Sequence, residues 1–277
     1  MNFKPPVEIA KNACSAAISK SSLPLRSMFV MGFLAGAYIA FGGFMMTVVM
    51  QDAAQYVGVG ISKLLGGAVF AVGLMLVIVG GAELFTGNCL MPIGALSGCV
   101  SFGKVAKNWA VVYVANLVGA VVLAWLVYGT GLASGATGVN VVKIAAAKVN
   151  IPVSQMFFRG ILCNWLVVMA VWMSFSAMDV VSKYICCLIP ISAFVTMGFE
   201  HSIANMYFIA LGILVKNGDS VTTTAAGIAP EQLARLDIAG YFGNIIPVTI
   251  GNIVGGAFFV AVLYYIVFAQ ELGRKED

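Results

Sequence analysis

Six long apolar stretches restrict this chain to a membrane fold. Each is close to, or longer than, the roughly 20 residues that an α-helix needs to cross a bilayer. Of the residues, 61% are hydrophobic and 9% are charged, whereas about a quarter of an average soluble domain is charged. A soluble core cannot bury so much apolar surface, so we expect an all-α, polytopic membrane domain over residues 1–277. The stretches are residues 27–50, 64–100, 109–131, 160–178, 184–215 and 245–269.

The segments outside the stretches predict how the chain is oriented. Pro5 and Pro6 open a short amphipathic helix within residues 1–26, which we expect to lie on the membrane surface. Six spans place both termini on one side. In that arrangement nine lysines and arginines lie on the side of the termini and six on the other side. Because positive residues favour the cytoplasmic side, the N-terminal helix and the tail at 270–277 are predicted to be cytoplasmic.

The two halves of the chain share one sequence pattern. Residues 81–88 (GAELFTGN) align with 198–205 (GFEHSIAN), and residues 116–120 (NLVGA) align with 252–256 (NIVGG). Each half, 27–131 and 138–269, holds three spans, so the second must enter the membrane from the opposite face. The second and fifth stretches are too long for one straight helix, and we expect both to be broken. Broken helices at matching places in an inverted repeat are typical of transport pathways.

Two carboxylates and two asparagines occupy equivalent positions at these breaks. Glu83 and Asn88 lie in the first half, and Glu200 and Asn205 lie in the second. Charge at membrane depth is costly and usually faces a cavity or a partner. Two bare carboxylates in a pore would repel anions, so we expect a structural role in which they cap half-helix N–H groups or anchor the loop. The alternative at Glu83 is a kinked helix that pairs this carboxylate internally.

One histidine breaks the symmetry between the halves. His201 is the only histidine, and Leu84 stands at the equivalent place. We expect His201 to act on the permeant species, although it could be a packed histidine bonded to a carbonyl group. Thr86 is expected to line the pathway. Lys148 could attract anions at the pore mouth or be a solvated lysine, and Asn164 could bond a neighbouring helix or a ligand.

Several function classes find no support in the sequence. There is no phosphate-binding loop or dinucleotide motif, a single histidine disfavours an imidazole metal site, and we expect no cofactor. The cations are scattered between apolar runs, which predicts no nucleic-acid partner. A membrane-embedded enzyme using Glu200 and His201 would need a nucleophile or cofactor site that the sequence does not offer. A neutral-solute channel of the aquaporin type would carry paired Asn-Pro-Ala motifs, which are missing here.

Five segments together resemble the formate/nitrite transporter family. They are residues 6–9 (PVEI), 81–86 (GAELFT), 107–109 (KNW), 198–206 (GFEHSIANM) and 244–252 (NIIPVTIGN). The resemblance implies an aquaporin-like fold, a homopentamer with one pore per protomer in the bacterial cytoplasmic membrane, and transport of a small anion rather than catalysis. Within the family the chain is similar to the hydrosulfide channel branch, which implies hydrosulfide as the substrate, with formate or nitrite also permeant. A dedicated formate or nitrite transporter is the alternative. Residues 86–88 (TGN) replace the small hydroxyl residues that formate members often carry.

The resemblance also implies roles for individual residues. Leu84, Phe85 and Thr86 match the mobile loop of the family. His201 matches its central histidine, with Lys148 and Asn164 drawing in and orienting the anion. The residues that match the apolar constriction are Phe70, Leu74, Val167 and Phe194, with Leu84 and Phe85 beside them. A substrate anion could take a proton from histidine, which titrates near pH 6.5 when unperturbed, and cross the constriction as the neutral acid.

Overall fold

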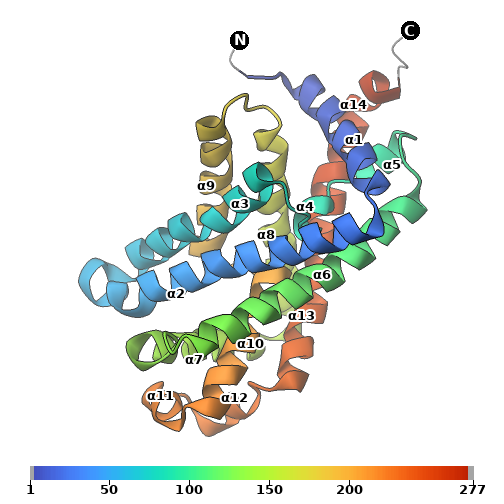
Figure 1. The fold of residues 1–277 in the computed structure, drawn as a ribbon. Helices are drawn as coiled ribbons and strands as arrows, with labels where there is room; N and C mark the ends of the chain where they lie inside the picture. Colours follow the sequence, from blue (N-terminus) through green and yellow to red (C-terminus); the bar gives the residue numbers. More distant parts are fainter. Residues whose placement is uncertain (1–2, 274–277) are drawn as a thin grey trace.

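The computed structural model describes residues 3–273, and within that range the chain is helical (Figure 1). The only strand-like pairing in this range is one bridge between Phe3 and Ala177. The predicted all-α class is therefore confirmed. In chain order the elements are α1 (Pro6–Ser22), α2 (Leu25–Phe70), α3 (Val72–Gly80), α4 (Phe85–Asn88), α5 (Pro92–Leu96), α6 (Phe102–Gly129), α7 (Gly135–Val149), α8 (Val153–Ser174), α9 (Val180–Met197), α10 (Ser202–Gly218), α11 (Ser220–Ala225), α12 (Pro230–Ala234), α13 (Ile238–Ile253), a π-helical segment (Val254–Val262) and α14 (Leu263–Gly273).

Five helical runs in the described part are long and apolar enough to cross a membrane, against six predicted spans. They are Leu25–Gly80, Phe102–Gly129, Val153–Ser174, Val180–Met197 and Ile238–Gly273. The first run contains two spans, because the backbone turns back at Gly58, where φ is 79° and ψ is 161°. Gly66 packs against Met50 and Gly73 against Tyr38, so the two arms run antiparallel.

The second and fifth spans are broken, as predicted. α3 ends at Gly81 (φ 79°) and α9 ends at Gly198 (φ 76°), and both glycines take the left-handed conformation that a side chain would strain. The chain becomes helical again at Phe85 and at Ser202. The continuations differ in length, because α4 and α5 have four and five residues whereas α10 has 17.

Glycines allow the long helices of each half to approach closely. α2 packs along α6, where Gly36 lies against the backbone of Asn116 and Gly119 against that of Phe33. α8 packs along α13 and the π-helical segment in the second half, and Gly255 of that segment lies against the backbone of Ile161. Small residues at helix crossings are typical of membrane proteins, because packing rather than hydrophobic exclusion holds the helices together in lipid.

The N-terminal helix packs on the protein, which corrects one expectation. The apolar face of α1 is buried and contacts α5, α6 and α14, whereas the sequence predicted that this face would rest on the membrane. Ala17 fits against Gly94 of α5, where a larger residue would collide. The predicted tail at 270–277 begins inside α14, and its last four residues lie outside the described range.

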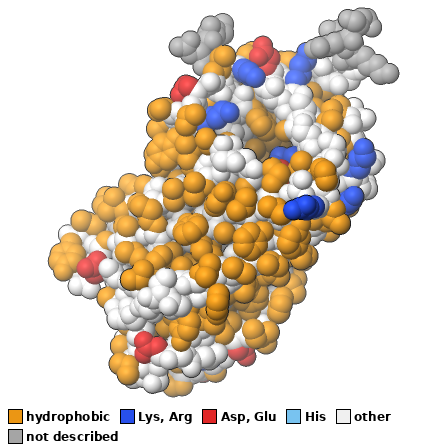
Figure 2. All heavy atoms as spheres, in the orientation of Figure 1, with side chains coloured by type: hydrophobic (Ala, Val, Ile, Leu, Met, Phe, Trp, Pro, Cys, Tyr) orange, Lys and Arg blue, Asp and Glu red, His pale blue; other side chains and the backbone are white. Residues whose placement is uncertain are grey.

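The surface fits a lipid environment. Figure 2 shows hydrophobic side chains covering most of one face, with charged side chains gathered toward its edges. Large apolar side chains such as Trp125, Phe158 and Ile266 are more than 60% exposed in the protomer. Apolar exposure on this scale is a liability in water and is favourable in a bilayer. The chain is a multi-pass membrane protein.

Candidate functional site

The two helix breaks contact each other through a hydrogen bond. Thr86 lies in the first turn of α4, and His201 is the residue that caps α10. Thr86 Oγ1 and His201 Nε2 are 2.9 Å apart, and both side chains are buried. The structure thus brings together two predicted pathway residues from opposite halves of the chain.

One asparagine in each half holds the backbone of a break. Asn116 Nδ2 donates to the carbonyl oxygen of Glu83 (2.9 Å), and its Oδ1 accepts from the N–H of Phe85 (2.9 Å). Asn252 repeats both bonds at the second break, at 3.0 and 2.9 Å. Each amide therefore satisfies backbone groups that the interrupted helix leaves unpaired.

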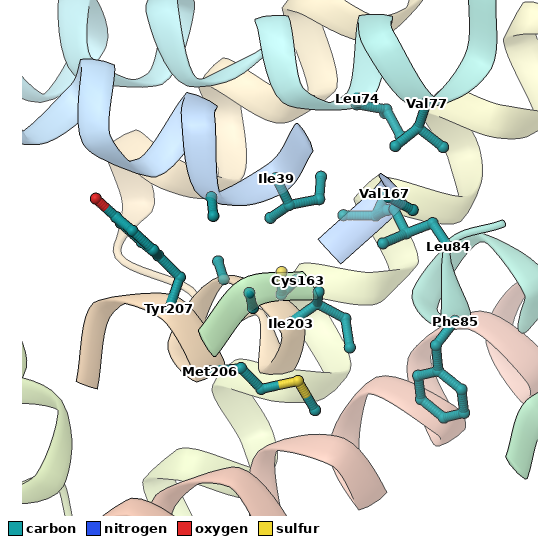
Figure 3. Packing of buried hydrophobic residues seen from close by; sticks show 14 of the residues in the cluster. Ile39, Leu74, Val77, Leu84, Phe85, Cys163, Val167, Ile203, Met206 and Tyr207 are labelled. Atoms are coloured by element: carbon teal, nitrogen blue, oxygen red, sulfur yellow. The ribbon is translucent and has the colours of Figure 1, made fainter. Parts of the chain in front are cut away.

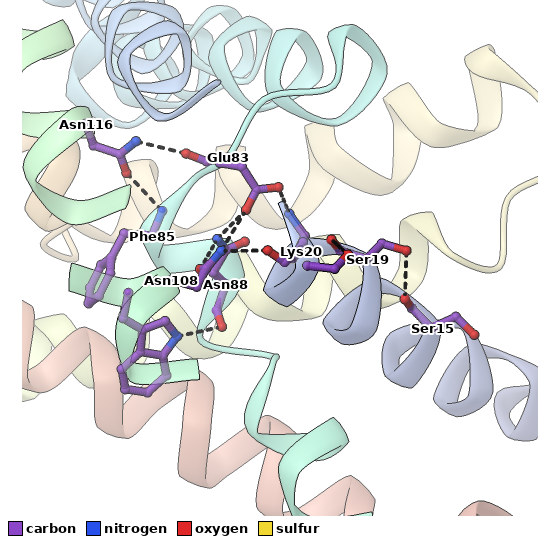
Figure 4. Close-up of polar contacts among 10 residues, drawn as sticks. Ser15, Ser19, Lys20, Glu83, Phe85, Asn88, Asn108 and Asn116 are labelled. Carbon is purple, nitrogen blue, oxygen red and sulfur yellow. Dashed lines mark hydrogen bonds and ion pairs between the residues drawn. The ribbon is translucent and has the colours of Figure 1, made fainter. Parts of the chain in front are cut away.

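Glu83 binds three side chains (Figure 4). Lys20 Nζ lies 2.6 Å from one carboxylate oxygen, and Asn88 Nδ2 donates to the other at 2.7 Å. Asn108 accepts from Asn88 (2.8 Å) and donates to Glu83 and to the carbonyl of Lys20, both at 3.4 Å. The carboxylate is nearly fully buried, with 4% of its side chain exposed, and its charge is compensated by Lys20.

Glu200 repeats this arrangement in the second half. Lys148 Nζ lies 3.1 and 3.2 Å from the two oxygens of Glu200, and Asn205 Nδ2 donates to one of them at 2.6 Å. Asn205 also donates to Asn244 (2.8 Å), which in turn donates to the carbonyl of Lys148 (2.9 Å). Lys148, Asn205 and Asn244 therefore correspond to Lys20, Asn88 and Asn108, as expected for an inverted repeat.

These contacts correct the expected role of the carboxylates. We expected Glu83 and Glu200 to cap half-helix N–H groups or to anchor the loop. In the described structure they accept hydrogen bonds from lysine and asparagine side chains, so the capping alternative is wrong. The backbone N–H groups are taken by Asn116 and Asn252 instead. A nearby cation stabilises a buried carboxylate more than a backbone N–H donor does, because a buried charge without a counter-charge is strongly destabilising. The expectation of internal pairing at Glu83 agrees with the structure.

His201 uses both ring nitrogens. Nδ1 accepts a hydrogen bond from the N–H of Ala204 (3.1 Å), so His201 is the N-cap of α10. An accepting Nδ1 carries no hydrogen, so in the neutral ring the hydrogen lies on Nε2 and is donated to Thr86 Oγ1. The hydroxyl hydrogen of Thr86 is then free for another acceptor. A second proton on the ring would have to enter at Nδ1, and it would break the cap.

Two cavities lie near this hydrogen bond. One is lined by Leu84 and Gly87, the neighbours of Thr86, and the other is lined by His201. The Lys20 cavity, of about 200 Å³, is lined by Glu83, Leu84 and Leu74 among others. The Lys148 cavity, of about 290 Å³, is lined by Glu200, His201 and the phenylalanines Phe70 and Phe194. The lining residues of the two cavities do not overlap.

Apolar side chains separate the two cavities. Phe70 lines the Lys148 cavity, whereas Leu74, one helical turn later, lines the Lys20 cavity. Both are at most 2% exposed, and Val167 on α8 is 1% exposed. Figure 3 shows Leu74 on one side of this region and Val167 with Leu84 on the other. The ring of Phe194 is 5.9 Å from that of Phe70, edge to face, and stacks over His201 at 5.9 Å.

Two of the expected pathway residues lie elsewhere. Phe85 packs edge-on against Trp109 (5.9 Å) and Tyr113 (4.9 Å) of α6 and lines neither cavity. Phe85 therefore anchors α4 against α6. Asn164 Nδ2 donates to the carbonyls of Thr86 (3.2 Å) and Asn252 (2.7 Å), which supports the interpretation that it bonds neighbouring segments.

Lys148 is neither a solvated lysine nor an isolated positive charge. Its side chain is 15% exposed and paired with Glu200, and its Nζ lies 5.4 Å from the ring centroid of Phe208. The sequence placed this lysine at the pore mouth as an attractor of anions. The structure places it in the cavity wall with its charge compensated.

Lys20 is the main residue that the sequence analysis missed. A signal was present, because Lys20 precedes Pro24 by four residues, as Lys148 precedes Pro152. The equivalence also means that α1 corresponds to α7. The first repeat therefore extends N-terminal to the predicted start at residue 27.

Comparisons with known proteins agree with this architecture. A family model described as formate/nitrite transporter matches residues 7–266. A probable formate transporter of Methanothermobacter thermautotrophicus is 43% identical, covering 98% of this chain and 99% of that protein. The formate channel FocA of Escherichia coli (strain K12) is 38% identical, covering 96% and 95%. A solved structure described as a pentameric formate channel with formate bound is 35% identical with a TM-score of 0.79, covering 88% of this chain and 98% of that one.

Proposed function

This chain belongs to the formate/nitrite transporter family, and we propose that it is a membrane channel for small monovalent anions of weak acids. Its relatives are channels or transporters, and the interior holds a pathway-like arrangement rather than a catalytic one. The observation that carries the proposal is the pair of cavities with an apolar barrier between them, crossed by the buried Thr86–His201 hydrogen bond.

The apolar barrier favours the neutral form of a solute over its charged form. A hydrated anion that enters the region of Leu74 and Phe70 must lose its water, and an uncompensated charge in apolar surroundings costs many kcal/mol. The conjugate acid of a weak-acid anion is neutral and avoids most of this cost. Formate, nitrite and hydrosulfide all have such a neutral form, whereas chloride has none at ordinary pH.

His201 is the group that could supply the proton. In its doubly protonated form, with Nδ1 released from the cap of α10, the ring passes its Nε2 proton to Thr86 Oγ1 while the Thr86 hydroxyl proton moves to the anion. The neutral acid then crosses the apolar barrier and releases the proton to water in the other cavity. The ring then regains a proton from water and the cycle repeats. Thr86 can relay the proton because its oxygen accepts from Nε2–H and its own hydroxyl hydrogen is free to bind the anion.

Formate is the first substrate to test and hydrosulfide is the second. The two relatives and the solved structure described above are a probable formate transporter and two formate channels. The Thr86-Gly87-Asn88 segment, which departs from the hydroxyl-rich loop of many formate members, favours hydrosulfide. Thr86 and His201 offer one small polar contact, which either anion can use.

We also propose the assembly and orientation of the channel. A homopentamer is supported by the described pentameric relative and by the large apolar area that a single protomer leaves exposed. Cytoplasmic termini in a bacterial inner membrane are supported by the distribution of lysine and arginine. With that orientation the Lys20 cavity opens inward and the Lys148 cavity outward. Native mass spectrometry of the detergent-solubilised protein should give five chains per particle.

The deciding experiment is anion flux in proteoliposomes. Purified protein should pass radiolabelled formate, nitrite or hydrosulfide well above empty liposomes, and chloride little. Uptake of neutral glycerol should stay at the level of empty liposomes, which separates this proposal from a neutral-solute channel. Should the protein pass none of the three anions while remaining assembled, the proposal is wrong.

A further inference from the structure

We propose that Lys63 and Arg159, rather than Lys148, collect anions at the mouth of the Lys148 cavity, and that the channel therefore captures anions more efficiently from this side than from the other. The inference rests on the proposed anion flux and adds the residues that set its entry rate. It concerns encounter at the mouth, before the barrier is reached.

Lys148 is a poor collector because its charge is already paired. Its Nζ lies within 3.2 Å of both oxygens of Glu200. From several ångströms away the lysine and the glutamate act as a dipole rather than as a net charge. The field of such a pair falls off faster with distance than that of a single cation.

Lys63 and Arg159 line the same cavity without such compensation. Neither forms an ion pair with a carboxylate among residues 3–273. Arg159 Nη2 donates to the neutral amide of Gln155 (3.0 Å), so its charge is retained. Its backbone carbonyl accepts from the N–H of Glu200 (3.3 Å), which fixes Arg159 beside the helix break. Lys63 lies on the second arm of α2, seven residues before Phe70, and is exposed.

The Lys20 cavity has no equivalent cations in its described lining. Its charged lining residues are Lys20 and Glu83, which pair at 2.6 Å. The two cavities thus share the paired lysine and glutamate but differ in the two additional cations. The matching networks of the inverted repeat would otherwise give the two cavity linings the same attraction for an anion.

The size of the effect follows from Coulomb's law. A unit charge about 10 Å from an anion in water without salt raises the local anion concentration roughly twofold. Two such charges give about fourfold. At about 0.15 M salt, screening over about 8 Å reduces the combined effect to less than about twofold. The advantage is kinetic, so it appears in entry rates at low substrate concentration and leaves equilibrium distribution unchanged.

The test measures initial flux from each side separately. Right-side-out and inside-out membrane vesicles carrying the wild type, Lys63→Gln, Arg159→Gln or the double variant are given [14C]formate, or hydrosulfide where the wild type passes only that anion. Substrate stays far below saturation, and salt is varied from about 10 mM to 0.5 M. Lys143→Gln is the matched control, because Lys143 is an exposed lysine on α7 that does not line this cavity.

The expected result is a loss that depends on both side and salt. At about 10 mM salt the double variant should pass about threefold less anion from the Lys148 side and an unchanged amount from the Lys20 side, with the loss nearly vanishing at 0.5 M salt. Lys143→Gln should lose much less. The inference is wrong if the double variant takes up anion as fast as the wild type, or if its loss is equal from both sides or insensitive to salt. The proposed function stands in each of these cases as long as the wild type passes the anion. A wild type that passes no anion overturns the proposed function itself.

Discussion

His201 joins a structural and a chemical role in one side chain. Its Nδ1 caps α10, which runs for 17 residues, while its Nε2 contacts Thr86. Leu84, at the equivalent position, offers no side-chain cap, and α4 ends after four residues. An N-cap contributes about 1 kcal/mol, so part of the difference between the two half-helices follows from this single substitution.

The two roles of His201 can be separated by choice of replacement. Asparagine is a strong N-cap, so His201→Asn should keep α10 and the thermal stability of the purified protein while losing the contact with Thr86 and the titratable ring. We expect lower flux, with a dependence on pH that differs from that of the wild type. His201→Leu should lose about 1 kcal/mol of stability as well. A flux–pH curve for His201→Asn that overlays the wild-type curve would contradict the proton-donor role.

Thr86 gives a second test at the same hydrogen bond. Thr86→Val keeps the shape but removes the hydroxyl, so the Nε2–H of His201 loses its acceptor in a buried site, which costs about 1–3 kcal/mol. Flux should fall strongly, about tenfold or more if that cost applies to the crossing step. Thr86→Ser keeps the hydroxyl and should retain most of the flux. Equal flux in both variants at equal assembly would show that the methyl-bearing shape, not the hydroxyl, is what the pathway needs.

The sequence predicted which residues belong to the site better than it predicted where their side chains point. The repeat of GxExxxxN gave the equivalence of Glu83 with Glu200 and of Asn88 with Asn205, which the hydrogen bonds confirm. It could not show that Phe85 turns toward α6, because helix spacing after a break depends on how the chain re-enters the helix. The partner of Glu83 was also missed, since Lys20 lies 63 residues away and only its spacing to Pro24 points to it.

At the scale of helices, the fold depends on backbone contacts that leave no room for side chains. Gly251 of α13 lies against the backbone of Phe157 and Gly160 on α8. Backbone atoms cannot move aside as a flexible side chain can. The same helix offers an internal comparison, because Gly243 has open space around its Cβ position.

Gly251→Ala and Gly243→Ala should therefore have opposite effects on stability. The first should destabilise the purified protein by about 1–3 kcal/mol through overpacking. The second should be neutral or stabilising by up to about 1 kcal/mol, because alanine favours a helix. Tryptophan fluorescence during thermal unfolding in detergent measures both. A Gly251→Ala protein as stable as the wild type would mean that α8 and α13 can separate at little cost.

The elements themselves were largely predictable, because apolar length is a direct signal. All six spans and both breaks were predicted. The turn at Gly58 joined two of them into one continuous helical run, since helical hydrogen bonds extend up to both sides of the glycine. The prediction that the apolar face of α1 rests on the membrane was wrong, because an amphipathic helix has the same sequence pattern whether that face contacts lipid or packs on α5 and α14.

At the scale of the whole molecule, the inverted repeat places one buried ion pair beside each cavity. Lys20 and Glu83 are 26% and 4% exposed, and Lys148 and Glu200 are 15% and 6% exposed. Two asparagines lie beside each pair, and one of them donates both to the carboxylate and to the amide oxygen of the other. The two pairs should therefore contribute to stability in the same way, independently of any role in flux.

Neutralising either glutamate tests this equivalence. Glu83→Gln and Glu200→Gln each leave a partly buried lysine without its counter-charge, which should cost about 1–3 kcal/mol, between the values for exposed and for fully buried pairs. The second variant should lose more, because Lys148 is less exposed than Lys20. Adding Lys148→Gln to Glu200→Gln should restore part of the loss, since no unpaired charge remains. Glu231→Gln, at an exposed position of α12, serves as the control and should change stability by less than about 0.5 kcal/mol. A Glu83→Gln protein with wild-type stability beside a severely destabilised Glu200→Gln protein would mean that the two networks match in geometry but not in energy.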